Sequence, residues 1–191
     1  MKYHFFAYMA RMKYIKRWGL MNSSKEENIQ EHSLQTAMIA HALALISNKY
    51  FGGQEDAEHI AAIAMYHETS EVLTGDLSTP IKYFNPKIKT AYKEIERIAD
   101  EKLLQMLPEE LRPEYEELIL NYTPEEYRLV KAADKICAYL KCVEEMKTGN
   151  LEFREAKNSL WHEIQKMHLP EVDYFMEKFA ESFELSLDSL G

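Results

Sequence analysis

Two histidines and two carboxylates in this sequence have the types and surroundings expected of metal ligands. His32 opens a long predicted helix, the pair His67-Glu68 ends another, and Asp134 lies inside a third, among apolar or small residues. A charge in such a run is costly to bury unless it is paired or binds a metal ion. Two imidazoles with two carboxylates suit a divalent transition metal such as Mn, Co or Fe, with Zn also possible.

Spacing along the chain limits how these groups can meet. Adjacent residues on a continuous α-helix point about 100° apart, so His67 and Glu68 can reach one ion only if the helix ends or bends there. The small polar residues Thr69 and Ser70 favour such an end. The alternatives are ordinary ones, with each histidine a structural residue and Asp134 in a salt bridge to a nearby lysine. Spacing alone leaves both interpretations open.

Four further residues could act on a phosphate ester. Arg17 offers a planar fork for two phosphate oxygens, or is a surface cation. Trp18 could stack on a base or sugar, or be a helix-end aromatic. Glu71 follows Glu68 by three residues, so both share one face of a helical turn, unless Glu71 is simply a solvated acid. Asp76 could cap a turn, or accept a hydrogen bond from a sugar hydroxyl or from Trp18 Nε1.

The elements that must position these residues are predicted to be helices. Apolar residues recur at three- and four-residue spacing, and glycine and proline number only 6 each, which argues against a turn-rich β fold. We predict one all-α domain over residues 1–191 with about seven or eight helices. The clearest segments are 4–16, 30–50, 54–66, 87–106, 124–147, 151–167 and 170–187, with a short helix after Pro113 and a mixed polar loop between 67 and 86.

Composition excludes several classes of protein. The net charge of −9 disfavours binding of a nucleic-acid polymer, which needs a basic face. No apolar run approaches the roughly 18 residues of a membrane span, so we expect no membrane association. Cys137 and Cys142 match neither a redox nor a zinc motif and are predicted to be buried thiols. These features favour a cytoplasmic protein.

Four sequence blocks carry a resemblance to a known family. They are FFAYMARMKYIKRWGLM, NIQEHSLQTAMIAHALA, AMYHETSEVLTGDLSTPIKYF and VKAADKICAYLKCVEE. With its order of histidine, histidine-acid and aspartate, the chain is similar to the HD-domain metal-dependent phosphohydrolases. Within these it resembles the bacterial 5′-deoxynucleotidases of the YfbR type, from His4 nearly to the end. The resemblance implies a helical bundle of the HD-domain type.

The resemblance also implies roles for individual residues. Arg17 would orient the substrate phosphate, Trp18 would contact the nucleoside, and Glu71 would be the catalytic acid/base. The implied metal ligands are His32, His67, Glu68 and Asp134. The implied substrate-binding residues are Arg17, Trp18, His32, Glu68, Asp76, Leu77, Ser78, Thr79 and Asp134.

The sequence departs from this family at two positions. Glu68 stands where the family has aspartate, which keeps the charge but reaches one methylene further. We expect a shifted metal ion or a slightly moved helix end, with an effect on metal preference and rate. Ser78 stands where the family usually has proline, which should loosen the loop.

The resemblance therefore implies a homodimeric, metal-dependent 5′-nucleotidase that hydrolyses deoxyribonucleoside 5′-monophosphates with little regard for the base. The expected cofactor is one divalent ion, Co or Mn, with Zn or Mg as alternatives. One competing hypothesis keeps the fold but takes another small phosphate ester or a phosphodiester. The other is a non-catalytic nucleotide-binding relative that Glu68 has weakened.

Overall fold

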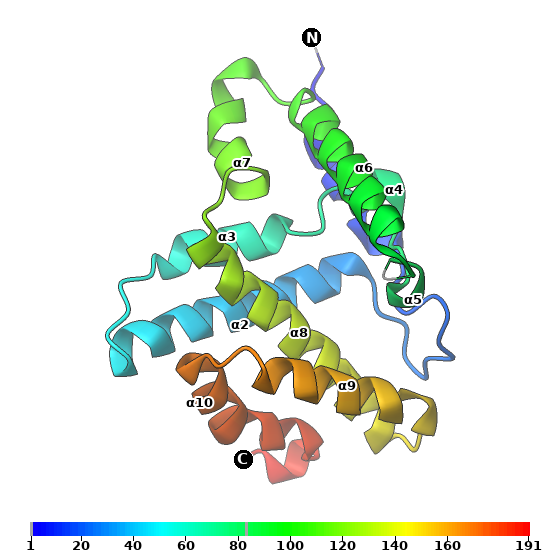
Figure 1. Ribbon diagram of the computed structural model, residues 1–191, viewed down its shortest axis with the longest axis vertical. Helices are drawn as coiled ribbons and strands as arrows, with labels where there is room; N and C mark the ends of the chain where they lie inside the picture. Colours follow the sequence, from blue (N-terminus) through cyan, green and yellow to red (C-terminus); the bar gives the residue numbers. More distant parts are fainter. Residues whose placement is uncertain (1, 83) are drawn as a thin grey trace.

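The computed structural model describes residues 2–82 and 84–191, and the regular elements of that part of the chain are helices, as predicted (Figure 1). Seven of its α-helices have eight residues or more, and none of the described helices is long and apolar enough to cross a membrane. The α-helices are α1 (Phe5–Met9), α2 (Ile29–Tyr50), α3 (Ala57–Tyr66), α4 (Glu71–Thr74), α5 (Thr79–Lys82), α6 (Pro86–Leu104), α7 (Arg112–Ile119), α8 (Pro124–Lys147), α9 (Arg154–Gln165) and α10 (Pro170–Phe179).

Helices α2 and α8 form the centre of the molecule, and both begin at residues that favour a helix start. The Asn28 side chain accepts hydrogen bonds from the first-turn N–H groups of α2. Thr123 and Glu126 form a reciprocal capping box at α8, followed by proline in the first turn. Helix α8 crosses α2 and also contacts α3 and α9 (Figure 1). Their crossing brings the start of α2 close to the middle of α8.

The core consists of two apolar clusters. The larger one lies between α2, α3, α8 and α10 and includes Leu43, Ile60 and Ile136, all fully buried. The smaller one joins Phe5 and the first residue of α2 to the end of α6. Because α2 contributes to both clusters, it connects the two parts of the interior.

The first and last predicted helices are shorter in the structure than the sequence suggested. The segment predicted as helical over 4–16 is α1 followed by a 3₁₀ turn at Met12–Tyr14. It cannot continue because Ile15 accepts a backbone bond from Ile29, and Arg17 donates one to Glu27, in an antiparallel bridge that requires extended backbone. The last helix, predicted to reach 187, ends at Phe179 and continues as 3₁₀ turns.

A buried carboxylate holds the segment that connects the two sides of this bridge. Glu145 on α8 is 1% exposed and accepts hydrogen bonds from Ser24 N at 2.8 Å, Ser24 Oγ at 2.6 Å and Lys25 N at 3.2 Å. It also pairs with buried Lys141, whose ammonium donates to the Lys25 carbonyl. Burial opposes ionisation of Glu145, but the hydrogen bonds from Lys141 and Ser24 outweigh it and lower its pKa. The segment carrying Arg17 and Trp18 is thereby attached to α8.

We predict that Glu145→Ala lowers the free energy of unfolding by about 3 kcal/mol or more, because it leaves the Lys141 ammonium buried without its partner. Since the pKa of Glu145 is lowered on folding, its contribution is present above the ordinary value of 4.5 and is lost on acidification. The difference in free energy of unfolding between wild type and Glu145→Ala, measured in urea, should therefore become smaller below that pH. Glu144→Ala, one residue earlier on the exposed side of α8, is the control. Equal stability of the two variants would contradict this account.

Candidate active site

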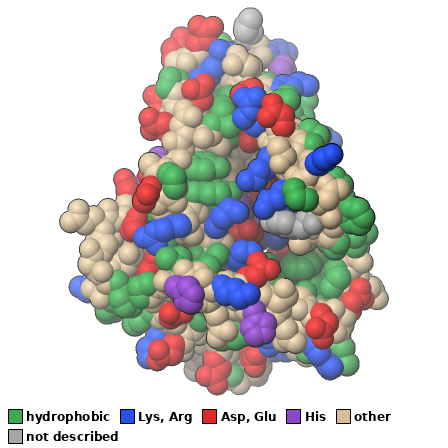
Figure 2. All heavy atoms as spheres, in the orientation of Figure 1, with side chains coloured by type: hydrophobic (Ala, Val, Ile, Leu, Met, Phe, Trp, Pro, Cys, Tyr) green, Lys and Arg blue, Asp and Glu red, His purple; other side chains and the backbone are tan. Residues whose placement is uncertain are grey.

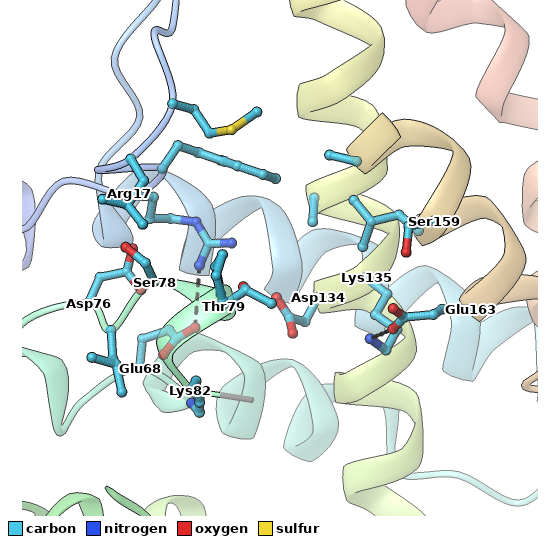
Figure 3. A pocket seen from close by; sticks show the side chains of 18 of the residues that line it. Arg17, Glu68, Asp76, Ser78, Thr79, Lys82, Asp134, Lys135, Ser159 and Glu163 are labelled. Atoms are coloured by element: carbon cyan, nitrogen blue, oxygen red, sulfur yellow. Dashed lines mark hydrogen bonds and ion pairs between the residues drawn. The ribbon is translucent and has the colours of Figure 1, made fainter. Parts of the chain in front are cut away.

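A cavity of about 660 Å³ opens between the N-terminal segment, the loop after α4, and helices α8 and α9. Figure 2 shows a hollow on this face where Lys and Arg side chains gather beside acidic ones. Most of the predicted site residues line the cavity, and the two histidines are not among its lining residues. The predicted residues that do line it are Arg17, Trp18, Glu68, Glu71, Asp76, Leu77, Ser78, Thr79 and Asp134 (Figure 3).

Three of the predicted metal ligands meet where the first turn of α2 faces the middle of α8. His32 is fully buried, and its Nε2 lies 3.1 Å from Asp134 Oδ1 and 4.0 Å from Glu68 Oε1. Asp134 points from α8 into the cavity (Figure 3). Asp134 pairs with His32 and not with a lysine, and the adjacent Lys135 pairs with Glu163 on α9 instead. The alternative salt bridge considered for Asp134 is therefore wrong.

His67 completes the cluster because α3 ends just before it. Tyr66 is the last residue of α3, and its C-cap His67 keeps helical dihedrals, φ −64° and ψ −18°, before the turn over residues 67–70. His67 Nδ1 lies 2.6 Å from the Ala64 carbonyl, which can only accept, so Nδ1 carries the proton. His67 Nε2 is consequently left with its lone pair, buried without a hydrogen-bond partner and 3.4 Å from Glu68 Oε1.

The electrostatics of the cluster favour bound positive charge. Burial, helped by Arg17, lowers the pKa of His32, which keeps that imidazole neutral. Burial opposes ionisation of Glu68 and of Asp134, but their histidine neighbours outweigh it and lower both pKa values. Burial lowers the pKa of His67, and the Glu68 carboxylate outweighs it and raises the net value. A proton and a metal ion would therefore compete for the same imidazole nitrogen.

These residues fit a divalent metal ion. One ligand atom from each of His32, His67, Glu68 and Asp134 lies within 4.8 Å of all the others. Nitrogen and oxygen atoms bound to one ion at about 2.0–2.2 Å lie up to twice that length from one another, which is close to the separations found here. The unpartnered Nε2 of His67, with its tautomer fixed from behind by a carbonyl, is the feature expected of a metal-binding imidazole.

Arg17 lies at the edge of this cluster with its guanidinium in the cavity. Its Nη1 is 3.4 Å from Glu68 Oε1 (Figure 3). Its Nε is 3.1 Å from Glu27 Oε2. Burial opposes the charge of Arg17, but the carboxylates of Asp134, Glu68 and Glu27 outweigh it and raise its pKa. The guanidinium is thus a fixed cation beside the metal ligands.

Glu71 is a buried carboxyl group on the cavity wall. It starts the short helix α4 and is 4% exposed, and its Oε2 has no hydrogen-bond partner among the described residues. Burial, together with the nearby carboxylates of Glu68 and Asp76, raises the pKa of Glu71 well above its usual value. Such a group holds a proton at neutral pH and can donate it.

The loop after α4 forms the wall nearest Arg17. Gly75 adopts a φ of 74°, which turns the chain so that the loop 76–79 faces the cavity. The Tyr92 hydroxyl on α6 donates to the Gly75 carbonyl at 2.9 Å. Lys82 on α5 also lines the cavity and pairs with Glu96 on α6 at 2.9 Å. Helix α6 thereby holds both ends of the loop.

Sequence reasoning missed Glu27 and Lys82. Glu27 bonds Trp18 Nε1 at 2.9 Å, so the proposed hydrogen bond from Trp18 to Asp76 is not the one formed. No motif points to Glu27, because its position depends on the bridge between residues 15–17 and 27–29. The only indication for Lys82 was a basic residue two positions after Pro80, the first proline of the loop.

The fold and the metal-type cluster define an HD-domain phosphohydrolase architecture. An HD-domain phosphohydrolase from Listeria innocua matches with a TM-score of 0.82 at 20% identity, covering 94% of this chain and 88% of that one. The HD phosphohydrolase of cyanophage S-2L, bound to dA and one catalytic Zn²⁺ ion, matches with a TM-score of 0.68 at 21% identity, covering 93% and 95%. At these identities the likeness concerns the fold alone.

The chain belongs to the 5′-deoxynucleotidase YfbR-like family, whose model matches residues 4–183. A 5′-deoxynucleotidase from Vibrio cholerae is 57% identical over 98% of both chains. The 5′-deoxynucleotidase YfbR of Salmonella arizonae is 55% identical over 98% of this chain and 96% of its own. The family resemblance inferred from the sequence blocks is confirmed.

We predict that His67→Ala binds far less than one metal ion per chain, because it removes an imidazole whose lone pair is already fixed toward the cluster. Glu71→Gln should retain wild-type metal content, since Glu71 lies outside the four-ligand set. Metal is measured by mass spectrometry after loading with Mn²⁺ or Zn²⁺ and desalting. His162→Ala, which removes an exposed histidine on α9, is the control for adventitious binding. Loss of metal from Glu71→Gln would instead make Glu71 a ligand or its support.

Proposed function

We propose that this protein is a metal-dependent 5′-nucleotidase that converts deoxyribonucleoside 5′-monophosphates and water to deoxynucleosides and inorganic phosphate. The observation that carries the proposal is a cluster of four metal-type ligand atoms at the edge of one cavity, which Arg17 and the buried Glu71 carboxyl group also line. The membership of the YfbR-like family and the names of the curated relatives support the same substrate class.

In this proposal His32, His67, Glu68 and Asp134 bind one divalent ion. Bound there, the ion would lower the pKa of water and polarise the phosphoryl group. Co or Mn is the expected metal, with Zn or Mg as alternatives, because a set of two imidazoles and two carboxylates accepts several of them. Glu68 reaches one methylene further than the aspartate of the family, and its Oε1 still lies within 4.0 Å of His32 Nε2 and 3.4 Å of His67 Nε2.

Arg17 and the loop 76–79 orient the substrate. The guanidinium presents paired donors to two phosphate oxygens beside the metal cluster. Trp18 stands next to Arg17 on the cavity wall, packed on Phe153 with 5.3 Å between ring centroids, and offers an apolar face to the nucleoside. The loop opposite Trp18 contacts the sugar and the phosphate through Asp76, Leu77, Ser78 and Thr79.

Glu71 supplies and removes the proton of the reaction. The oxygen of the attacking water forms the new P–O bond, and the bond from phosphorus to the sugar O5′ breaks. The departing O5′ needs a proton, which the protonated Glu71 carboxyl group donates. The attacking water gives up one of its two protons as the P–O bond forms. The Glu71 carboxylate accepts that proton, which returns the site to its starting state.

The test is phosphate release by metal-stripped protein resupplied separately with Mn²⁺, Co²⁺, Mg²⁺ or Zn²⁺. We predict release from dAMP with a transition metal and little release from AMP, because the loop 76–79 and Trp18 enclose the sugar. A 3′-monophosphate and a cyclic dinucleotide complete the panel. Glu71→Gln should lose turnover by about 100-fold or more, the usual contribution of acid–base catalysis.

Other outcomes of the panel identify the competing functions. Turnover of the cyclic dinucleotide or the 3′-monophosphate, with none of dAMP, would assign a different phosphate ester. Absence of turnover with every metal, restored by Glu68→Asp, would identify a relative that has drifted from catalysis. Either result would overturn the proposed function.

The proposal extends to the whole chain and its setting. Residues 1–191 act as a single HD-domain unit, supported by the contribution of α2 to both apolar clusters. The cytoplasm is the proposed location, supported by Cys137 and Cys142, both buried as free thiols. The substrate is a small nucleotide, and neither a nucleic-acid polymer nor a membrane is a proposed partner.

We further propose that two copies of the chain associate through α2. Leu34, Met38 and Leu45 lie on one face of α2 at helical spacing, and they are 52%, 63% and 48% exposed. A stripe of exposed apolar side chains on a central helix is typical of a surface that a partner covers. A second copy is the occupant that the family resemblance implies.

Light scattering after size exclusion should give twice the chain mass of 22.4 kDa. Met38→Lys, which places a charge in the middle of the stripe, should shift the protein to the monomer mass. The control is Glu114→Lys, an exposed charge change on α7, away from this face of α2. A wild-type monomer at micromolar concentration would exclude the dimer, and a Met38→Lys dimer would place its interface elsewhere.

A further inference from the structure

One carboxylate oxygen outside the predicted site holds both residues of the Arg17-Trp18 pair. Glu27 Oε2 accepts a hydrogen bond from Arg17 Nε at 3.1 Å and another from Trp18 Nε1 at 2.9 Å. The side chains of Arg17 and Glu27 are 13% and 11% exposed, so solvent screens this contact weakly. Hydrogen bonds between such charged partners are stronger than neutral ones.

The backbone fixes Glu27 opposite the pair. Arg17 N donates to the Glu27 carbonyl at 2.9 Å, and Ile29 N donates to the Ile15 carbonyl at 3.0 Å. These bonds align residues 15–17 antiparallel to residues 27–29, with Lys16 opposite Asn28. Glu27 is held from its own side as well, because the segment before it is bonded to Glu145 and Asn28 caps α2.

Trp18 needs such a partner because its backbone is strained. Its φ of 61° lies in the left-handed region, which is unfavourable for a bulky residue and persists only when surrounding contacts enforce it. The indole is held at two points, by Glu27 at Nε1 and by Phe153 against its ring. The indole therefore has a fixed orientation on the cavity wall.

The same contact determines which nitrogens of Arg17 face the cavity. Because Nε is bonded to Glu27, the guanidinium plane is set by two carboxylates, Glu27 at Nε and Glu68 near Nη1. The terminal nitrogens remain on the cavity side, where a phosphate would be bound. A guanidinium that is already oriented loses less conformational freedom on binding a phosphate.

We propose that Glu27 is a positioning residue that orients Arg17 toward the substrate phosphate and Trp18 toward the nucleoside through a single carboxylate. Its kinetic consequence rests on the proposed function. Its structural consequence, the orientation of the Trp18 indole, does not. The role is distinct from catalysis, because Glu27 acts on the substrate only through its two neighbours.

The kinetic test compares Glu27→Ala and Glu27→Gln with wild type on dAMP. Glu27→Ala should lower kcat/KM about 10- to 100-fold, the range expected for a lost charged hydrogen bond, with metal content unchanged. Glu27→Gln keeps an acceptor oxygen within reach of both donors and should recover part of this loss. Glu26→Ala is the matched control, because Glu26 pairs with Lys16 across the same two segments but on the solvent side, 74% exposed.

A double-mutant cycle separates positioning from a general loss of structure. If Glu27 acts on the phosphate through Arg17, Glu27→Ala should lower kcat by less than about threefold when Arg17 is already alanine. Its remaining effect should then appear in KM, through Trp18. An equal loss of kcat in both backgrounds, or an equal loss in Glu26→Ala, would overturn the proposal.

The indole N–H resonances provide a measurement that does not depend on activity. The sequence has 2 tryptophans, Trp18 and Trp161, so Trp161→Phe assigns the two indole signals in a ¹H–¹⁵N spectrum. Glu27→Ala should move the Trp18 signal upfield and leave the Trp161 signal in place, while Glu26→Ala should move neither. An unmoved Trp18 signal would overturn the proposal. A moved signal in a protein that hydrolyses none of the tested substrates would uphold the contact while the proposed function fails.

Discussion

The end of α3 at Tyr66 is the constraint on which the candidate site depends. On a continuous helix His67 and Glu68 would point in different directions. With His67 as the C-cap, its imidazole turns back to the carbonyl of Ala64 while Glu68 continues toward α2. The carbonyl fixes the tautomer, and one ligand atom of each side chain lies within 4.8 Å of those of His32 and Asp134.

Charge balance around this point explains the neighbouring residues. Two carboxylates and two imidazoles are costly to hold together in a partly buried place unless a cation accompanies them. Arg17 provides a permanent one, 3.4 Å from Glu68, and a divalent ion would provide the other. Burial, together with the carboxylates of Glu68 and Asp76, raises the pKa of Glu71. The chemical difference between Glu68 and Glu71, two carboxyl groups three residues apart, thus follows from their surroundings.

The segment over residues 15–28, which carries Arg17 and Trp18, has little regular structure of its own. Its position relies on two glutamates that accept several hydrogen bonds each. Glu145 holds residues 24 and 25 on α8, and Glu27 holds Arg17 and Trp18 beside the cavity. A segment without its own core can be placed accurately in this way, because a buried carboxylate without its donors destabilises the folded state.

The sequence by itself determined the helices and the residue types of the site, because these depend on local preferences. Asn28 and Thr123 start α2 and α8 as cap residues do, and the apolar repeat sets the lengths of those helices. Only the tertiary structure decided which charges meet. His32, His67 and Asp134 are far apart along the chain, and the crossing of α2, α3 and α8 brings them together. Likewise Trp18 bonds Glu27 and not Asp76, because the pairing of residues 15–17 with 27–29 ended the predicted first helix. Such pairings are set by which segments pack against one another, and neither helical periodicity nor spacing encodes that information.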